Sequence, residues 1–337
     1  MLQASRMLSS IALVLSLLSC SQGFQSLQHS QRGLHLQVSP SPAIRLSLSS
    51  SASDLLTADD GTIATWNTPS GQTVTLIGTA HLSKKSNEQV KQVIEKCQPN
   101  IVMVELDPAR LSRIGINSVD DIQLEVVTSE DIELPNQPPQ PWYWLALNLF
   151  AQVARKFLTG MYNSASKDMK NNDGGGGEFL AAIRSAEACP NCHKLILGDR
   201  DSVTTIRRTF QLAIESGNPF ALWGKFSEAN QQEMDEMQRQ VQQELGADGK
   251  EVDSGELQVA MMERLKSDSD LRDRLFAKLE QEVPEFTQAF LKERDYIMGQ
   301  AIGRELTQDP SVKQVVAVVG LAHVPGIQAH LEGMFSK

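Results

Sequence analysis

Four short runs of apolar residues stand out along the chain, and they are separated by stretches with helical periodicity. The runs cover residues 73–77, 101–104, 195–197 and 315–319. Continuous apolar runs of this length are typical of strands that are buried on both faces. Helical patterns, among them 87–97 and 285–306, lie between them. The sequence therefore predicts an α/β fold with a parallel or mixed central sheet and helices on its faces.

All four predicted strands are followed by polar residues. His81 follows the first strand, Glu105 the second, Asp199 and Arg200 the third, and His323 the fourth. In open α/β sheets, ligands bind beyond the carboxyl ends of the strands. This edge of the sheet is therefore the predicted place of a functional site.

The first and fourth strands share one ending. Residues 74–81 and 316–323 both finish in Gly-x-Ala-His, and the glycine lets the chain turn sharply away from the strand. Two imidazoles and the carboxylate of Glu105 form a familiar ligand set for catalytic Zn, Mn or Fe. The alternative is that His81 and His323 are neutral residues that hold turns together.

Five motifs, in this order, resemble the TraB/PrgY family, which includes pheromone-shutdown proteins and eukaryotic TraB-domain proteins. They occupy 78–83, 104–107 with Arg110, 198–201, 293–295 with Met298, and 319–326. The family is distantly similar to the Tiki metalloproteases and to the erythromycin-esterase/ChaN-like group. The resemblance implies an erythromycin-esterase/ChaN-like fold with helical insertions, metal ligands at His81, Glu105 and His323, and hydrolysis of peptides.

Two arginines near the strand ends are candidates for a catalytic role. Arg110 and Arg200 could bind a substrate carboxylate or stabilise an oxyanion, because the planar guanidinium suits both tasks. Asp107 is a candidate to orient a ligand histidine.

For other charged residues of the sequence, a structural role is at least as good an explanation as a catalytic one. Arg294 and Asp295 lie in the predicted helix 285–306, where a buried structural ion pair explains them as well as a function does. Arg207 and Arg208 are predicted to be surface or structural residues.

The segments 135–177 and 227–282 are predicted to be helical insertions. Within the first, 142–162 forms an amphipathic pattern. Such a helix could make a peripheral contact with a membrane or a partner, or it could pack as a core or lid helix. The methionines of the second insertion are expected to pack between helices.

Cys189, Cys192 and His193 match the C-x-x-C-H pattern of covalent haem attachment. A redox-active dithiol and ordinary turn residues are the other interpretations, and the segment leads directly into the third strand. The pattern is also half of a zinc site, but no second cysteine pair completes it, and nothing in the sequence places a second axial ligand for a haem. We therefore favour turn residues.

Composition narrows the class of protein. The 337 residues are 41% hydrophobic and 21% charged, as in a globular protein, and the net charge is −10. An acidic chain is poorly suited to bind the phosphate backbone of nucleic acids, so no nucleic-acid partner is expected.

The first 53 residues contain three arginines and no acidic residue. Residues 1–23 have the charged, apolar and small-residue order of a signal peptide, and residues 24–53 have the composition of a transit peptide. With Phe24 at the junction, they resemble the bipartite plastid presequences of algae with complex plastids. We expect a plastid location for the TraB domain at 61–337; a mitochondrion and the secretory pathway are the alternatives.

These observations lead to one functional hypothesis and one rival. The hypothesis is a hydrolase that acts on peptides with a divalent Mn, Zn, Co or Fe ion, in which Glu105 is a metal ligand or the general base. The rival is a non-catalytic protein that sequesters peptides or tethers membranes.

Overall fold

The computed structural model describes residues 62–79, 84–135, 140–165, 177–217, 231–246 and 268–336, together with 257, 260, 261 and 264. His81 and the two predicted presequence segments, 1–23 and 24–53, lie outside the described residues. The described strands are β1 (Ile63–Asn67), β2 (Thr73–Thr79), β3 (Ile101–Val104), β4 (Glu125–Thr128), β5 (Lys194–Leu197) and β6 (Gln314–Gly320).

Helices account for most of the remaining described chain. The α-helices are α2 (Lys84–Cys97), α3 (Trp144–Ala165), α4 (Gly177–Ala188), α5 (Ser202–Glu215), α7 (Gln231–Leu245), α9 (Ser269–Glu282), α10 (Pro284–Thr287), α11 (Glu293–Gln308) and α12 (Val324–Phe335). A π-helical turn, η4 (Gln288–Lys292), joins α10 to α11, and the 3₁₀ turns are η2 (Pro108–Ile114), η3 (Val119–Asp121) and η5 (Leu321–His323).

The six strands form one mixed sheet in the order β1-β2-β6-β3-β5-β4. Only the β1–β2 pair is antiparallel; every other neighbouring pair is parallel. The predicted α/β fold with a mixed central sheet is therefore confirmed. The parallel register places Thr79 opposite Gly320, so the two Gly-x-Ala-His strands end side by side.

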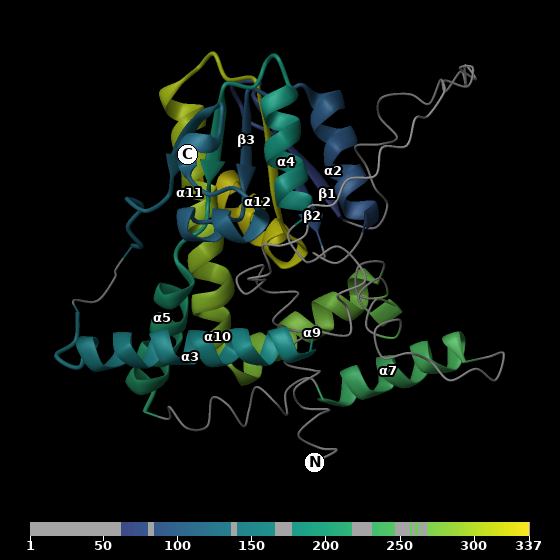
Figure 1. The fold of residues 1–337 in the computed structure, drawn as a ribbon, viewed down its shortest axis with the longest axis vertical. Helices are drawn as coiled ribbons and strands as arrows, with labels where there is room; N and C mark the ends of the chain where they lie inside the picture. The colour runs from purple at the N-terminus through teal and green to yellow at the C-terminus, as the bar shows by residue number, and fades with distance from the viewer. Residues whose placement is uncertain are drawn as a thin grey trace, which may run out of the picture.

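The apolar runs are continuous because both faces of the sheet are covered. Val102 and Val104 belong to the core beneath α2 and α4, whereas Ile101 and Met103 belong to the core beneath α11 and α12. Figure 1 shows these two helical layers on opposite sides of the strands. Alternate residues of a strand point to opposite faces, so each run contributes to both cores.

A group of helices covers the carboxyl ends of the strands. Residues of α3, α5, α9, α10 and η4 form a separate apolar cluster, and Ala322 of η5 packs against it. Figure 1 shows α3 and α10 below the sheet, at the end where the strands finish. The predicted helix at 142–162 is α3, and its side chains Leu147 and Ala151 are buried. The edge predicted to carry the site thus lies between the sheet and this helical group.

The second predicted insertion is also helical where the structure describes it. Met234, Met237 and Met261 pack with Leu271 and Leu275 in a cluster between α7 and α9, as expected for packing methionines. Among the described residues, no helix combines the length and the apolarity needed to cross a bilayer.

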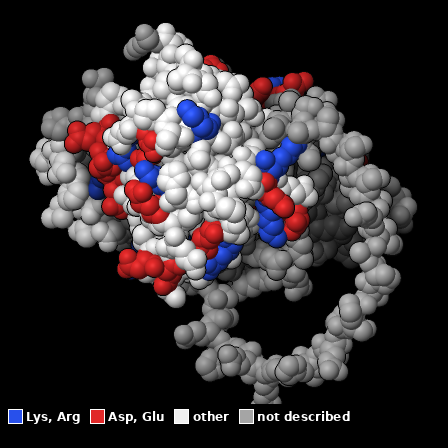
Figure 2. Space-filling view, turned by 90° about the horizontal axis from the view of Figure 1, so that it is seen from above, with Lys and Arg blue, Asp and Glu red and all other residues white. Residues whose placement is uncertain are grey.

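Charged side chains of both signs share the face that lies at the top of Figure 1. Figure 2 shows described basic side chains next to acidic ones around a broad uncharged area. The described part of this face therefore lacks the continuous basic stripe that would follow a phosphate backbone.

Candidate functional site

Glu105 is held in place from two sides at the end of β3. Its side chain is fully buried, and the backbone N–H of Gly320, at the end of β6, donates to Oε2 at 2.6 Å. Nη2 of Arg294, in α11, donates a hydrogen bond to Oε1. The parallel pairing of Val104 with Val318 brings these two strand ends together. The carboxylate is therefore fixed in one orientation by the sheet and by a helix.

His323 lies beside Glu105 at the end of the neighbouring strand. The imidazole is fully buried in η5, with Nδ1 2.5 Å from Oδ1 of Asp295. Its Nε2 lies 3.4 Å from Oε1 of Glu105, but it has no hydrogen-bond partner there. The structure thus brings two of the three predicted metal ligands together, and it leaves a nitrogen atom open toward Glu105.

Asp295 is the carboxylate that orients this histidine. A carboxylate on one ring nitrogen fixes the tautomer and aims the other nitrogen at the site, as it does in metal centres. Burial opposes a charged imidazole, but the charges of Glu105 and Asp295 outweigh it and raise the pKa of His323 to about 9. The site therefore favours a positive charge at His323, either a proton on Nε2 or a cation bound there in place of that proton.

Gly326 allows α12 to approach the carboxylate of Asp295. A Cβ atom at this position would overlap Oδ2 of Asp295, so only glycine fits. At Gly333, in the same helix, a Cβ atom would meet no other atom within 4 Å. The glycine that ends the motif 319–326 therefore leaves room for the carboxylate of Asp295, which contacts His323.

This close approach leads to a first prediction. Gly326→Ala should lower the free energy of unfolding by about 1–3 kcal/mol, because Asp295 must move. Gly333→Ala should raise the free energy of unfolding by up to about 1 kcal/mol, since alanine is the better helix former. Urea denaturation followed by circular dichroism measures both. Equal stabilities of the two variants would contradict the role given to Gly326.

Asp199 connects the strand ends to one another. It follows β5, and Nε and Nη2 of Arg294 donate to its two carboxylate oxygens at 2.9 and 2.7 Å. Nη2 of Arg110 also donates to it. Burial raises the pKa of Asp199, but Arg294 and Arg110 outweigh it and lower the pKa to about 2. Asp199 is therefore a permanent negative charge between two arginines.

Arg110 is a buried member of the same network. Its Nε donates to Oδ2 of Asp107 at 2.5 Å, and its Nη1 has no hydrogen-bond partner. Asp107 also caps η2 by accepting from the N–H of Ala109 at 2.8 Å. The carboxylate on His323 is Asp295, so the role predicted for Asp107 is carried out at this histidine by a different residue.

Arg200 belongs to a second buried cluster around Glu293. Its Nη1 donates to Oε2 of Glu293 at 2.7 Å, its Nη2 to the carbonyl of Ala289 at 2.7 Å, and its Nε to Thr205 at 3.1 Å. Arg208 donates from Nη2 to the other oxygen of Glu293 at 2.8 Å and is buried. All three nitrogens of Arg200 are thus bound to the protein.

The π-helical turn η4 precedes three consecutive charged residues that each serve a different partner. Glu293 binds the second cluster, Arg294 binds Glu105 and Asp199, and Asp295 binds His323. The sequence predicted one uninterrupted helix over 285–306, whereas the structure has a π turn at Gln288–Lys292. Such turns are frequent at functional sites.

The sequence pointed to the residues of this network, but it did not predict which of them bind one another. Asp199 was part of a strand-end motif, and that position was its signal. For Arg294 and Asp295 the sequence left a structural ion pair and a functional role equally open, and in the structure they bind Glu105 and His323 rather than each other. Nothing local in the sequence identifies these partners, because about 190 residues separate Arg294 from Glu105.

The charges of the site bear on whether it suits a cation. Four carboxylates lie with two guanidinium groups and an imidazole, which leaves one negative charge in excess even when the imidazole is protonated; the groups are Glu105, Asp107, Asp199, Asp295, Arg110, Arg294 and His323. Among the described residues, which exclude His81, no three His, Cys, Asp or Glu side chains are arranged to hold a metal. The open Nε2 of His323 and the excess negative charge fit a divalent ion; the third predicted ligand, His81, lies outside the described residues.

The two cysteines of the C-x-x-C-H segment form a turn between α4 and β5. The N–H of Cys192 donates to the carbonyl of Cys189, and both side chains are buried in the core beneath α2 and α4. Burial raises the pKa of the Cys192 thiol to about 11, which disfavours the reactive thiolate. These contacts match the interpretation of the cysteines as turn residues.

Comparison with known proteins gives one family. Residues 64–334 match the sequence profile of the TraB/PrgY/gumN family. Similar curated proteins are the "TraB domain-containing protein" of Homo sapiens, 27% identical over 280 residues, and that of Bos taurus, 26% identical over 278 residues. Each match covers 77% of this chain and 62% of the relative, so it spans less than two thirds of the relatives' length.

Proposed function

Because the chain belongs to the TraB/PrgY/gumN family, we propose that it is a metal-dependent hydrolase that acts on peptides. One observation carries the proposal: the buried Nε2 of His323 has no hydrogen-bond partner and faces Glu105, while Asp295 fixes the ring from the other side. A buried nitrogen without a partner is costly, and a bound cation would satisfy it.

His323, Glu105 and His81 would hold the divalent ion, which could be Mn, Zn, Co or Fe. When bound, the ion supplies Lewis acidity for the attack of water on a peptide carbonyl. Glu105 accepts from Arg294 and Gly320, and a carboxylate has further lone pairs to bind a cation or take a proton. Glu105 therefore either completes the ligand set or acts as the general base.

The two candidate arginines have different roles in this proposal. Arg110 retains a nitrogen, Nη1, without a protein partner, so it can donate to a developing oxyanion. Arg200 is bound to Glu293, Ala289 and Thr205 through all its nitrogens, so we assign it a positioning role. It anchors the start of α11, from which Arg294 and Asp295 reach the site.

Metal content of the purified full-length protein tests the proposal. After equilibration with each of the four metals, we expect stoichiometric metal in the wild type and its loss in His323→Ala. His330→Ala is the matched control, because this histidine lies on α12 against Tyr296 and Gly299, outside the network. Metal is measured by mass spectrometry, and cleavage is assayed with a peptide mixture.

The rival function predicts a different result. A protein that sequesters peptides or tethers membranes would bind no metal under metal-replete conditions and would leave the peptide mixture intact. Metal that remains bound in His323→Ala would also count against the proposed site.

A further inference from the structure

Exposed apolar side chains are concentrated at one place in the described structure. Six large apolar side chains are exposed, and five of them lie within twelve consecutive residues; these five are Trp142, Leu145, Leu149, Phe150 and Val153. Isolated exposed apolar residues are common, but a contiguous group marks a contact surface. The group lies on α3 and the residues just before it.

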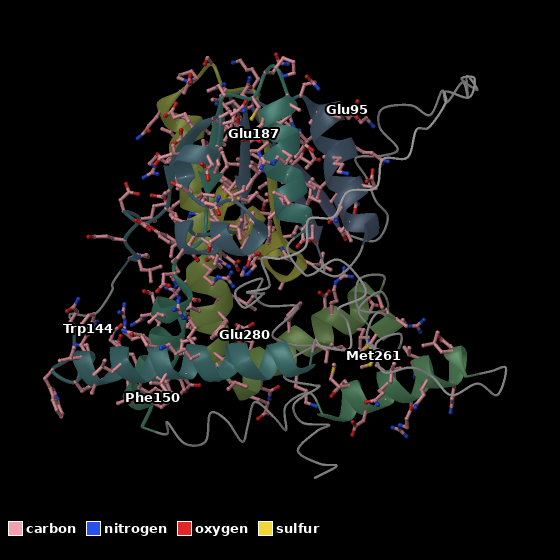
Figure 3. All side chains as sticks on the ribbon, viewed as in Figure 1. Glu95, Trp144, Phe150, Glu187, Met261 and Glu280 are labelled. Carbon is pink, nitrogen blue, oxygen red and sulfur yellow. The ribbon has the colours of Figure 1, made fainter. Side chains whose placement is uncertain are left out.

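Helix α3 has two apolar faces, and only one is covered by the protein. Leu147 and Ala151 are buried on the side that packs against α5. At about 100° per residue, Leu145, Leu149 and Val153 lie together on the opposite side. Figures 1 and 3 show α3 lying across α5 and α10 in the lower part of the molecule, with its amino end extending beyond them.

The charge of this segment is opposite to that of the chain. No acidic residue occurs between Glu133 and Asp168, whereas Arg155, Lys156 and Lys167 are basic, in a chain with a net charge of −10. Lys156 is exposed, and its position in the helix places it within the stripe of Leu145, Leu149 and Val153. The exposed apolar stripe itself therefore carries one basic residue, Lys156, and no acidic one, whereas Arg155 lies 3.8 Å from Asp201.

We infer that the exposed face of α3, formed by Trp142, Leu145, Leu149 and Val153 with Lys156, binds the surface of an anionic lipid bilayer. An apolar helix face with a tryptophan at one end and a lysine at the other is suited to lie in the plane of the membrane interface. A second copy of the chain that packs the same stripe against this one is a poorer occupant, because the stripe offers no acidic residue to pair with Lys156. The inference does not depend on the proposed hydrolase activity.

Co-sedimentation of the full-length protein with vesicles tests this inference. The vesicles are phosphatidylcholine alone, or three parts phosphatidylcholine to one part phosphatidylglycerol. We expect Leu149→Glu to weaken binding to the mixed vesicles by at least about tenfold. Lys156→Gln should weaken binding to the mixed vesicles about fivefold and leave binding to pure phosphatidylcholine unchanged. Gln308→Glu, an exposed site at the end of α11, adds the same charge as Leu149→Glu and should bind like the wild type.

Several outcomes would overturn the inference. The inference is wrong if the wild-type protein does not sediment with the vesicles. It is also wrong if Leu149→Glu binds them as strongly as the wild type does. A wild-type dimer in light scattering without lipid, dissociated by Leu149→Glu, would assign the stripe to a second copy instead. If Leu149→Glu is poorly folded by circular dichroism, Leu145→Glu replaces it, because Leu145 is 65% exposed.

Discussion

Replacement of Arg294 by methionine is expected to lower the free energy of unfolding by about 3–5 kcal/mol. Arg294 is 1% exposed, and its guanidinium donates to both oxygens of Asp199 and to Glu105. Methionine has a similar volume, so the main effect is that the buried carboxylates of Asp199 and Glu105 each lose a counter-charge. Breaking a buried pair by removing one partner is far more costly than replacing the whole pair.

Arg304→Met is the matched control on the same helix. Arg304 pairs with Asp131 at 2.7 Å, but Asp131 is 69% exposed, so this substitution should change stability by less than about 1 kcal/mol. Chemical denaturation at neutral pH measures both variants. Similar stabilities of Arg294→Met and Arg304→Met would show that the buried ion pairs of Arg294 contribute no more to the free energy of unfolding than the surface pair of Arg304 does.

The central strands could be predicted from sequence because burial on both faces leaves a local pattern. All residues of β3 are buried, and the observed Ile101–Val104 coincides with the predicted run. The edge strands β1 and β4 were missed, since their residues alternate or remain half-exposed and form no continuous apolar run. An edge strand depends on its neighbour for pairing, which a local pattern does not show.

The candidate site could be predicted only in part, for a related reason. Glu105 and His323 follow strands, so the sheet topology brings them together once the strands are known. Their partners Arg294 and Asp295 come from a helix that is distant in sequence, and the π turn at Gln288–Lys292 interrupts the regular periodicity before them. Helical periodicity alone therefore could not assign these two residues to the network.

The most informative substitution is Glu105→Gln, which keeps the size of the side chain and removes its charge and its capacity to accept a proton. Both oxygens of Glu105 now accept hydrogen bonds, from Arg294 and from the N–H of Gly320. A glutamine can accept only one of them, because its NH₂ group would face the other donor. We therefore expect a folded protein that is about 1–3 kcal/mol less stable.

Peptide cleavage by Glu105→Gln should fall by about 10²–10⁴-fold if the carboxylate is the general base, with metal retained at the wild-type stoichiometry. Loss of metal together with activity would instead identify Glu105 as a ligand, since two imidazoles alone bind a divalent ion weakly. Glu305→Gln is the matched control: Glu305 is buried and bound to Lys194 at 2.6 Å, at the amino end of β5. It should lose stability without losing turnover, so a wild-type cleavage rate in Glu105→Gln would refute the mechanism whatever its effect on folding.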